Sequence, residues 1–432
     1  MHLFNPENDL ALANFGINYT PPASAVKIAD DLAILPMWYA PEGAKVIAAT
    51  AQNEQFLSRL KEFFALEVSL IPFSGISLFP KEKIIPWGWN PALRKKLLDA
   101  GAMEESLPSM EELKQLRSDS GRKNAIHILN ELRAENNAFC GESYFFSAVD
   151  DVLHFLHSRN GDHVLKMPNS GSGKGLSWIK GKITDKQADW CRRVIHEQGG
   201  LIAEPVLNKI RDFAMEFCLS DNKAEFIGYS LFQSTSSGAY MGNFLMPQTD
   251  IEERLGEYTG PELLPQLRKS LAEKLCRQYP SYSGCLGVDM MVCKTNRGYQ
   301  IQPCVEINLR MNMGIVAYIL YDRFVKPGST GKFTVDFFKK TGGALTFQQK
   351  MSTDFPLIVE NGKIISGFLA LTPVSEQTQY LAYVFATSPS LPQNTGKTAE
   401  WYEYRCKTVP TENFRWASEW HQILTQNPLA PT

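Results

Sequence analysis

Two short segments with alternating apolar and polar side chains enclose a glycine-rich stretch near the middle of the chain. Residues 163–167 and 176–180 show the alternation that is typical of half-buried strands. Between them, Gly171, Gly173 and Gly175 stand at every second position. Glycines at this density let backbone N–H groups approach an anion closely. The pattern therefore predicts a hairpin whose tip is either a phosphate-binding loop or only a polar turn.

This loop differs from the common phosphate-binding motifs. GxxxxGK[ST] requires glycine where the chain has Pro168 and Ser or Thr where it has Gly175. GxGxxG fails because Leu176 stands at the position of its last glycine. Lys166 on the first strand and Lys174 in the loop nevertheless offer two ammonium groups to one anion.

The first 118 residues alternate between strand and helix patterns. Strands are expected at 45–49 and 66–71, and helices at 52–64 and 91–100. This alternation predicts an open α/β domain, in which ligands gather at the carboxyl ends of the strands. The polar run from Asn5 to Asp9 follows the first short strand, where it either binds a ligand or caps turns and helices.

Strand patterns predominate after the glycine-rich stretch. Between residues 212 and 217, large apolar side chains alternate with Asp212, Ala214 and Glu216, which predicts a strand with one apolar face. The other elements expected are a strand at 138–146, helices at 118–132, 185–198 and 263–279, a helix capped by Ser147 and ending at 157, and hairpin strands at 225–233 and 239–246.

A second informative stretch covers residues 284–314. Its alternation predicts two neighbouring strands that carry Asp289 and Glu306, with Asn308 and Arg310 just past the second strand. The first three of these side chains offer hard oxygen donors, which Mg²⁺ prefers. They form either a magnesium site or a set of surface and salt-bridged residues. Residues 331–432 add expected strands at 355–359, 363–371 and 380–385.

Composition limits the class of protein. The 432 residues are 44% hydrophobic and 21% charged, with a net charge of −2, as in ordinary globular proteins of two or three domains. This balance does not favour nucleic acid or a membrane surface as a partner. No apolar run approaches the length of a membrane span, and Glu7 and Asp9 come too early for a signal peptide, so a cytoplasmic protein is expected. The scattered cysteines form no CxxC motif and are expected to be reduced thiols.

Taken together, these pieces resemble the ATP-grasp superfamily over roughly residues 115–320. VLKMPNSGSGKG resembles the family's flap after a lysine-bearing strand, and LIAEPVL resembles its adenine-binding hinge. IRDF resembles the segment with the ribose-binding carboxylate, and EINLR resembles the family's metal signature. The chain departs from that signature at Leu309, where proline is usual.

The resemblance implies a role for each matching residue. For phosphate it implies Lys166 and Lys123, with Arg122 as a rival of Lys123, and the flap residues Ser170, Gly171, Ser172 and Gly173. For adenosine it implies Glu204, Val206, Leu207, Asp212 and Met291, and for one or two Mg²⁺ (or Mn²⁺) ions Asp289, Glu306 and Asn308. Arg310 would act on the acyl phosphate, and Lys174 would either do the same or remain solvated.

The implied activity is an ATP-dependent ligase that forms an acyl phosphate, ADP and phosphate, and joins the carboxylate to an amine or thiol. An ATP-grasp kinase and a non-catalytic nucleotide-binding protein are the alternatives. The implied fold is an α/β N-terminal domain (1–118), two α+β lobes (119–205 and 206–330) that grip ATP, and a β-containing extension (331–432). The substrates are expected to be small molecules, and the C-terminal strands could form the interface of a homo-oligomer.

Overall fold

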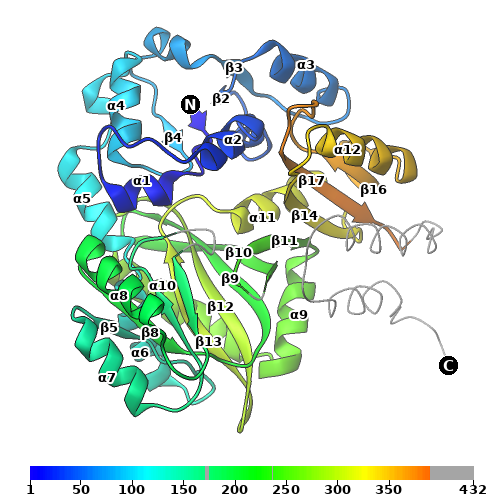
Figure 1. Cartoon of the computed structure of the whole chain (residues 1–432). Coiled ribbons are helices and arrows are strands. Elements are labelled where there is room, and N and C mark those ends of the chain that lie inside the picture. The colour runs from blue at the N-terminus through cyan, green and yellow to red at the C-terminus, as the bar shows by residue number, and fades with distance from the viewer. Residues whose placement is uncertain (171–174, 236, 390–432) are drawn as a thin grey trace, which may run out of the picture.

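The computed structural model describes residues 1–170, 175–235 and 237–389, whose strands form three sheets (Figure 1). The N-terminal sheet is parallel, with the order β3-β2-β1-β4. Its strands are β1 (His2–Leu3), β2 (Lys45–Ile47), β3 (Ser69–Ile71) and β4 (Ile85–Pro86), and the helices of this part are α1 (Asn8–Asn14), α2 (Ala23–Asp31), α3 (Ala51–Leu60), α4 (Pro91–Asp99) and α5 (Met110–Asp119). The predicted open α/β arrangement is confirmed.

The second sheet is small and antiparallel, with the order β5-β8-β6-β7. It consists of β5 (Tyr144–Phe146), β6 (His163–Lys166), β7 (Leu176–Ile179) and β8 (Leu201–Pro205), and α7 (Val149–Ser158) and α8 (Asp185–Gln198) share its core. Thr184 and Gln187 form a capping box at the start of α8, and Gly199 ends the helix in the left-handed region (φ 76°).

The third sheet is antiparallel and has the order β13-β12-β9-β10-β11-β14-β17-β16-β15. Its strands are β9 (Lys209–Ser220), β10 (Lys223–Ser234), β11 (Tyr240–Leu245), β12 (Gly284–Thr295), β13 (Gly298–Asn308), β14 (Thr330–Phe337), β15 (Ile358–Glu360), β16 (Lys363–Ala370) and β17 (Tyr380–Thr387). The sheet therefore continues across residue 330, because β14 pairs with β11 on one side and with β17 on the other.

Two large cores hold this sheet in place. The apolar face of β9, with Phe213, Met215 and Phe217 fully buried, shares a core with α6 (Lys123–Glu135), α9 (Gln248–Thr259), α10 (Leu263–Gln278) and α12 (Gly343–Asp354). The second core joins α11 (Met313–Phe324) to the N-terminal part and to β16 and β17. The Trp38 indole N–H donates to the carbonyl of Leu371 at 2.8 Å, so the N-terminal part is also hydrogen-bonded to the C-terminal strands.

Two local expectations were wrong. The strand expected at 138–146 begins only at Tyr144, because Gly141 adopts a positive φ of 94° that interrupts the extended backbone. The helix expected from Ser147 begins at Val149, and its N-cap is Ala148, which has no side-chain donor or acceptor. None of the helices within the described ranges combines the length and apolar character needed to cross a bilayer.

The core of the large sheet makes a testable contribution to stability. Leu271 of α10 is fully buried, whereas Leu78 is 76% exposed. We expect Leu271→Ala to lower the free energy of unfolding by about 2–5 kcal/mol, because the substitution leaves a cavity. The matched Leu78→Ala should change it by less than about 0.5 kcal/mol. Urea denaturation followed by tryptophan fluorescence measures both; equal losses would contradict this assignment of the core.

Candidate active site

The two strands that flank the glycine-rich stretch pair as the predicted hairpin. Lys166 at the end of β6 pairs with Leu176 at the start of β7, and the Met167 N–H donates to the Gly175 carbonyl at 2.9 Å. Gly175 has a φ of 78°, and a Cβ there would lie 2.7 Å from Ser170 Oγ, so this turn requires glycine. The predicted phosphate ligands Gly171, Ser172, Gly173 and Lys174 lie outside the described residues.

Lys166 and Glu204, which were predicted for different parts of the nucleotide, form one buried ion pair. Lys166 Nζ lies 2.7 Å from Glu204 Oε2, and the Ser143 hydroxyl donates to Glu204 Oε1 at 2.8 Å. β6 and β8 are adjacent antiparallel strands, which brings the two side chains together. Because both charges are buried, each depends on the other for compensation.

Arg122, rather than its neighbour Lys123, faces the hairpin. The helix expected at 118–132 is divided by a turn at 120–122, where the Arg122 N–H donates to the Pro168 carbonyl at 3.0 Å. The buried guanidinium donates to the Met167 carbonyl at 2.8 Å and to Ser170 Oγ at 2.6 Å. Lys123 begins α6 and is exposed.

Arg122 also connects the hairpin to the predicted metal ligands. Its guanidinium lies 2.8 Å from Glu306 Oε1. Glu306 on β13 stands directly opposite Asp289 on β12, and the Asn308 amide N–H donates to Asp289 Oδ2 at 3.2 Å. The predicted residues Asp289, Glu306 and Asn308 therefore converge at the end of one β-hairpin.

The chemistry of this cluster fits a divalent cation. Burial, followed by the negative charge of Glu306, raises the pKa of Asp289 to about 7 against the opposing effect of Arg310. Two facing carboxylates and an amide oxygen are hard donors, and a divalent cation would relieve their repulsion. The described residues contain no group of three His, Cys, Asp or Glu side chains suited to a metal, so a cation here would take Asn308 as its third protein ligand.

Arg310 brings the N-terminal part into the site. Its Nε and Nη2 donate to the two carboxylate oxygens of Asp9, each at 2.6 Å, and Nη2 also donates to Asn308 Oδ1 at 3.2 Å. Asp9 lies in the first turn of α1, within the polar run Asn5–Asp9. The Met311 N–H donates to the Trp87 carbonyl at 3.1 Å, which fixes the backbone beside Arg310 to the same domain.

The residues predicted to bind adenosine are spread over two sheets. Asp212 pairs with Lys209 at 2.6 Å, accepts from Ser234 Oγ at 2.5 Å and stands opposite Met291 on the neighbouring strand. Val206 follows β8, is 41% exposed and donates its N–H to the Asp162 carbonyl at 2.9 Å. The adjacent Leu207 is partly buried.

Glu216, for which no functional role was predicted, is a fully buried carboxylate on the same face of β9 as Asp212. The Asn312 amide donates to Glu216 Oε2 at 2.8 Å and, through Oδ1, accepts from the Ile315 N–H at the start of α11. Gly287 and Gly314 leave the room that this carboxylate fills, because a Cβ at either position would overlap it. Glu216 thus fixes the turn that follows Asn308 and Arg310. The only feature of the sequence that could have pointed to Glu216 was the alternation at 212–217, which put this residue on the polar face of the strand.

Comparison with solved structures identifies the fold. A crystal structure of a biotin carboxylase–beta-gamma-ATP complex from Campylobacter jejuni matches with a TM-score of 0.51 and 9% identity, over 99% of this chain and 95% of that one. An N5-carboxyaminoimidazole synthetase from Staphylococcus aureus complexed with ADP matches with a TM-score of 0.46 and 10% identity, over 85% and 97%. An L-amino acid ligase from Bacillus licheniformis matches with a TM-score of 0.44 and 12% identity, over 87% and 99%.

No protein-family model and no curated protein matches the sequence. The structural likeness to the biotin carboxylase nevertheless confirms the predicted fold class, since the chain has the ATP-grasp fold. At this identity the likeness concerns the fold alone.

Glu216 should make stability depend on pH. Burial, the largest cause, raises its pKa from 4.5 to about 8, so the folded state holds a proton that the unfolded state releases near pH 4.5. We therefore expect the free energy of unfolding to fall as pH rises from 5 to 8, by roughly 1 kcal/mol per pH unit from this group.

The variant Glu216→Gln mimics the protonated carboxyl and should remove that part of the slope. Urea denaturation of both proteins at several pH values measures the difference between their stability–pH slopes. Parallel stability–pH curves for wild type and Glu216→Gln would show that Glu216 is ionised in the folded protein.

Proposed function

We propose that this protein is an ATP-dependent ligase that activates a carboxylate as an acyl phosphate and joins it to an amine or thiol. The observation that carries the proposal is the ion pair of Arg122 with Glu306. It joins the glycine-rich hairpin of the small sheet to the carboxylates of the large sheet, so that a triphosphate held by the hairpin would meet the cation-binding side chains.

In this proposal the nucleotide lies between the two sheets. Lys166 and Arg122 hold phosphate oxygens, with Lys123 as the less favoured alternative to Arg122 because it is exposed. Ser170 and the loop residues Gly171, Ser172 and Gly173 contribute to phosphate binding. The adenosine contacts come from Glu204, Val206, Leu207, Asp212 and Met291.

Asp289, Glu306 and Asn308 would hold one or two Mg²⁺ ions, with Mn²⁺ as a substitute. A bound ion supplies charge neutralisation for the phosphoryl group in transfer. Arg122 would then exchange its contact with Glu306 for a phosphate oxygen, which keeps the guanidinium paired while the carboxylate turns to the cation.

Arg310 is proposed to position the carboxylate substrate and its acyl phosphate. Asp9, Asn308 and the Met311 carbonyl accept from four of the five N–H donors of its planar guanidinium. Asp9 thus fixes its orientation, and within the described residues one N–H remains for a substrate oxygen. A substrate carboxylate oxygen attacks the γ-phosphorus and ADP leaves. The amine or thiol then attacks the acyl carbon, phosphate leaves, and the nucleophile loses its proton. Lys174 could support the same anion from the loop.

The proposed enzyme acts on small molecules. Dependence on ATP and the free thiols of the described residues suit the cytoplasm.

The central test removes one carboxylate charge. Glu306→Gln should lower ADP release by about 100-fold or more, because a neutral amide holds the cation poorly. The assay contains ATP and Mg²⁺ with a panel of amino acids, dipeptides and small dicarboxylates. Glu225→Gln, an exposed position of β10 in the same sheet, is the matched control and should keep full activity. Unchanged ADP release by folded Glu306→Gln would remove this cluster from the mechanism.

The products of the same assay separate the three functions. A ligase requires both a carboxylate and a nucleophile and forms the joined product. A phosphorylated alcohol, formed without ligation, would identify a kinase. Nucleotide binding with no ADP release for the whole panel would identify a non-catalytic protein.

The neighbouring cations Arg122 and Lys123 provide a second test. Arg122→Met should lower kcat/KM for ATP by about 100-fold, because it removes a buried cation at the hairpin. The matched Lys123→Met should change it less than about twofold, as expected for an exposed charge. Arg122→Lys keeps the charge and should recover part of the activity. The opposite ranking of the two methionine variants would assign the phosphate contact to Lys123.

A further inference from the structure

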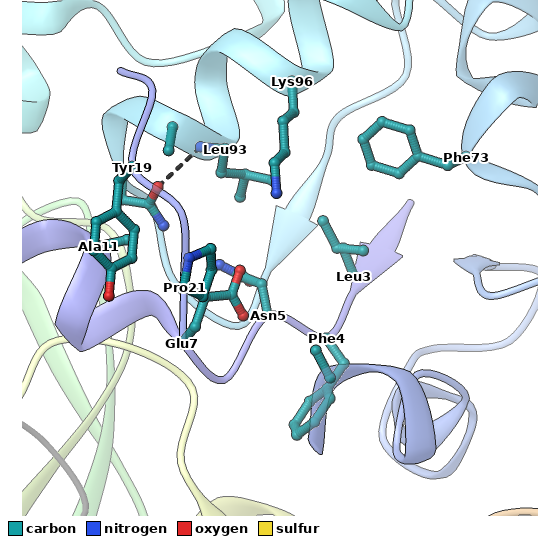
Figure 2. A pocket seen from close by; sticks show the side chains of 13 residues that line it. Leu3, Phe4, Asn5, Glu7, Ala11, Tyr19, Pro21, Phe73, Leu93 and Lys96 are labelled. Carbon is teal, nitrogen blue, oxygen red and sulfur yellow. Dashed lines mark hydrogen bonds between the residues drawn. The ribbon is translucent and has the colours of Figure 1, made fainter. Parts of the chain in front are cut away.

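A pocket lies at the carboxyl ends of the N-terminal sheet, apart from the site described above. Its volume is about 120 Å³, and it is lined by residues that follow β1, β3 and β4, together with α4 and the segment around Tyr19 (Figure 2). β1 is the point at which the strand order reverses, since β2 continues on one side of it and β4 on the other. Open parallel sheets bind ligands at such points.

Glu7 lines this pocket, and one of its carboxylate oxygens has no hydrogen-bond partner. Its Oε2 is buried and makes no hydrogen bond with any part of the described chain. Burial raises the pKa of Glu7, although the charge of Lys96 opposes this effect. The side chain plays no part in capping α1, because only the Glu7 carbonyl accepts from the helix. A buried oxygen without a partner is costly, and its presence has no structural explanation here.

The opposite wall of the pocket carries the complementary charge. Figure 2 shows Lys96 reaching from α4 toward the space that Glu7 approaches from the loop after β1. Asn5 and Asn90 add amide groups, but their amides are already occupied by Gly88, Asn8 and Leu93. The remaining surface is largely apolar and includes Phe4 and Phe73.

We propose that this pocket binds a small amino acid, whose ammonium group pairs with Glu7 and whose carboxylate pairs with Lys96. One anion and one cation lie on opposite walls of the pocket, which complements a zwitterion and not a simple cation or anion. The volume of about 120 Å³ limits the ligand to a small molecule, and the apolar walls suit a short aliphatic side chain. The proposal does not depend on the proposed ligase activity, because no residue of the pocket belongs to the nucleotide or metal site.

The test measures binding to the full-length protein without nucleotide. Isothermal titration calorimetry with glycine, L- and D-alanine and L-serine is compared with their N-acetyl derivatives and their amides. We expect at least one free amino acid to bind, and its N-acetyl form to lose about tenfold or more in affinity, because it lacks the cation that pairs with Glu7. The amide should also bind more weakly, because it lacks the carboxylate that pairs with Lys96.

Variants separate a binding role from a structural one. Glu7→Gln should reduce amino acid affinity by about tenfold or more. Without ligand it should melt no lower than the wild type, because it replaces a carboxylate whose buried Oε2 has no hydrogen-bond partner. Asp30→Asn removes an exposed charge that acts on Glu7 without lining the pocket, and it should bind like the wild type. Lys96→Met should weaken binding of the free amino acid and leave binding of the amide unchanged.

The proposal is overturned if no free amino acid binds the wild type, or if Glu7→Gln binds as tightly as the wild type. It is also overturned if Glu7→Gln lowers the melting temperature while leaving affinity intact, since Glu7 would then be structural. ADP release in the ligase assay is a separate readout, so failure of one proposal leaves the other standing.

Discussion

Charge compensation at the end of one β-hairpin is the constraint on which the site depends. Asp289 and Glu306 face each other across β12 and β13. Carboxylates this close and this poorly hydrated need positive charge. Arg122 supplies it from the turn before α6, and Arg310 supplies it from the segment after β13. The compensation therefore joins the hairpin of the small sheet to the metal-type residues of the large one.

Three of the proposed site's cations that lie within the described residues have a carboxylate partner. Lys166 pairs with Glu204, Arg122 with Glu306, and Arg310 with Asp9. At Lys166 and Arg122, nucleotide binding would therefore exchange a carboxylate partner for a phosphate, so neither cation would have to lose a full shell of water. Such an exchange avoids much of the desolvation cost of burying a charge, and it releases Glu306 for a cation. The same pairing keeps the site folded before a ligand arrives.

The sequence predicted those parts of the site that depend on local pattern. The alternation in 284–308 was enough to place Asp289 and Glu306 on neighbouring strands. It could not place them directly opposite each other, because a register shift between Asp289 and Met291 replaces the pairing that the turn alone would set. The choice between Arg122 and Lys123 was not predictable, since it depends on a turn whose N–H bonds the distant Pro168. Glu216 was missed as a site residue because glycines far along the chain create the space that it fills. The pairing of β14 with β11 was also not predictable, because the two strands are far apart in the sequence and no local pattern indicates that they are neighbours.

The start of α1 connects the pocket of the N-terminal domain to Arg310 of the candidate active site. Glu7 and Asp9 are two residues apart, and they point to different partners: Glu7 to the pocket, Asp9 to Arg310. The Glu7 carbonyl accepts from the Leu10 and Ala11 N–H groups, so the backbone between the two carboxylates is held as one helical turn. Any shift of Glu7 must therefore move Asp9, and with it the guanidinium that Asp9 orients. For this reason the N-terminal domain is part of the candidate active site: without that domain Arg310 would lose the partner that fixes its plane.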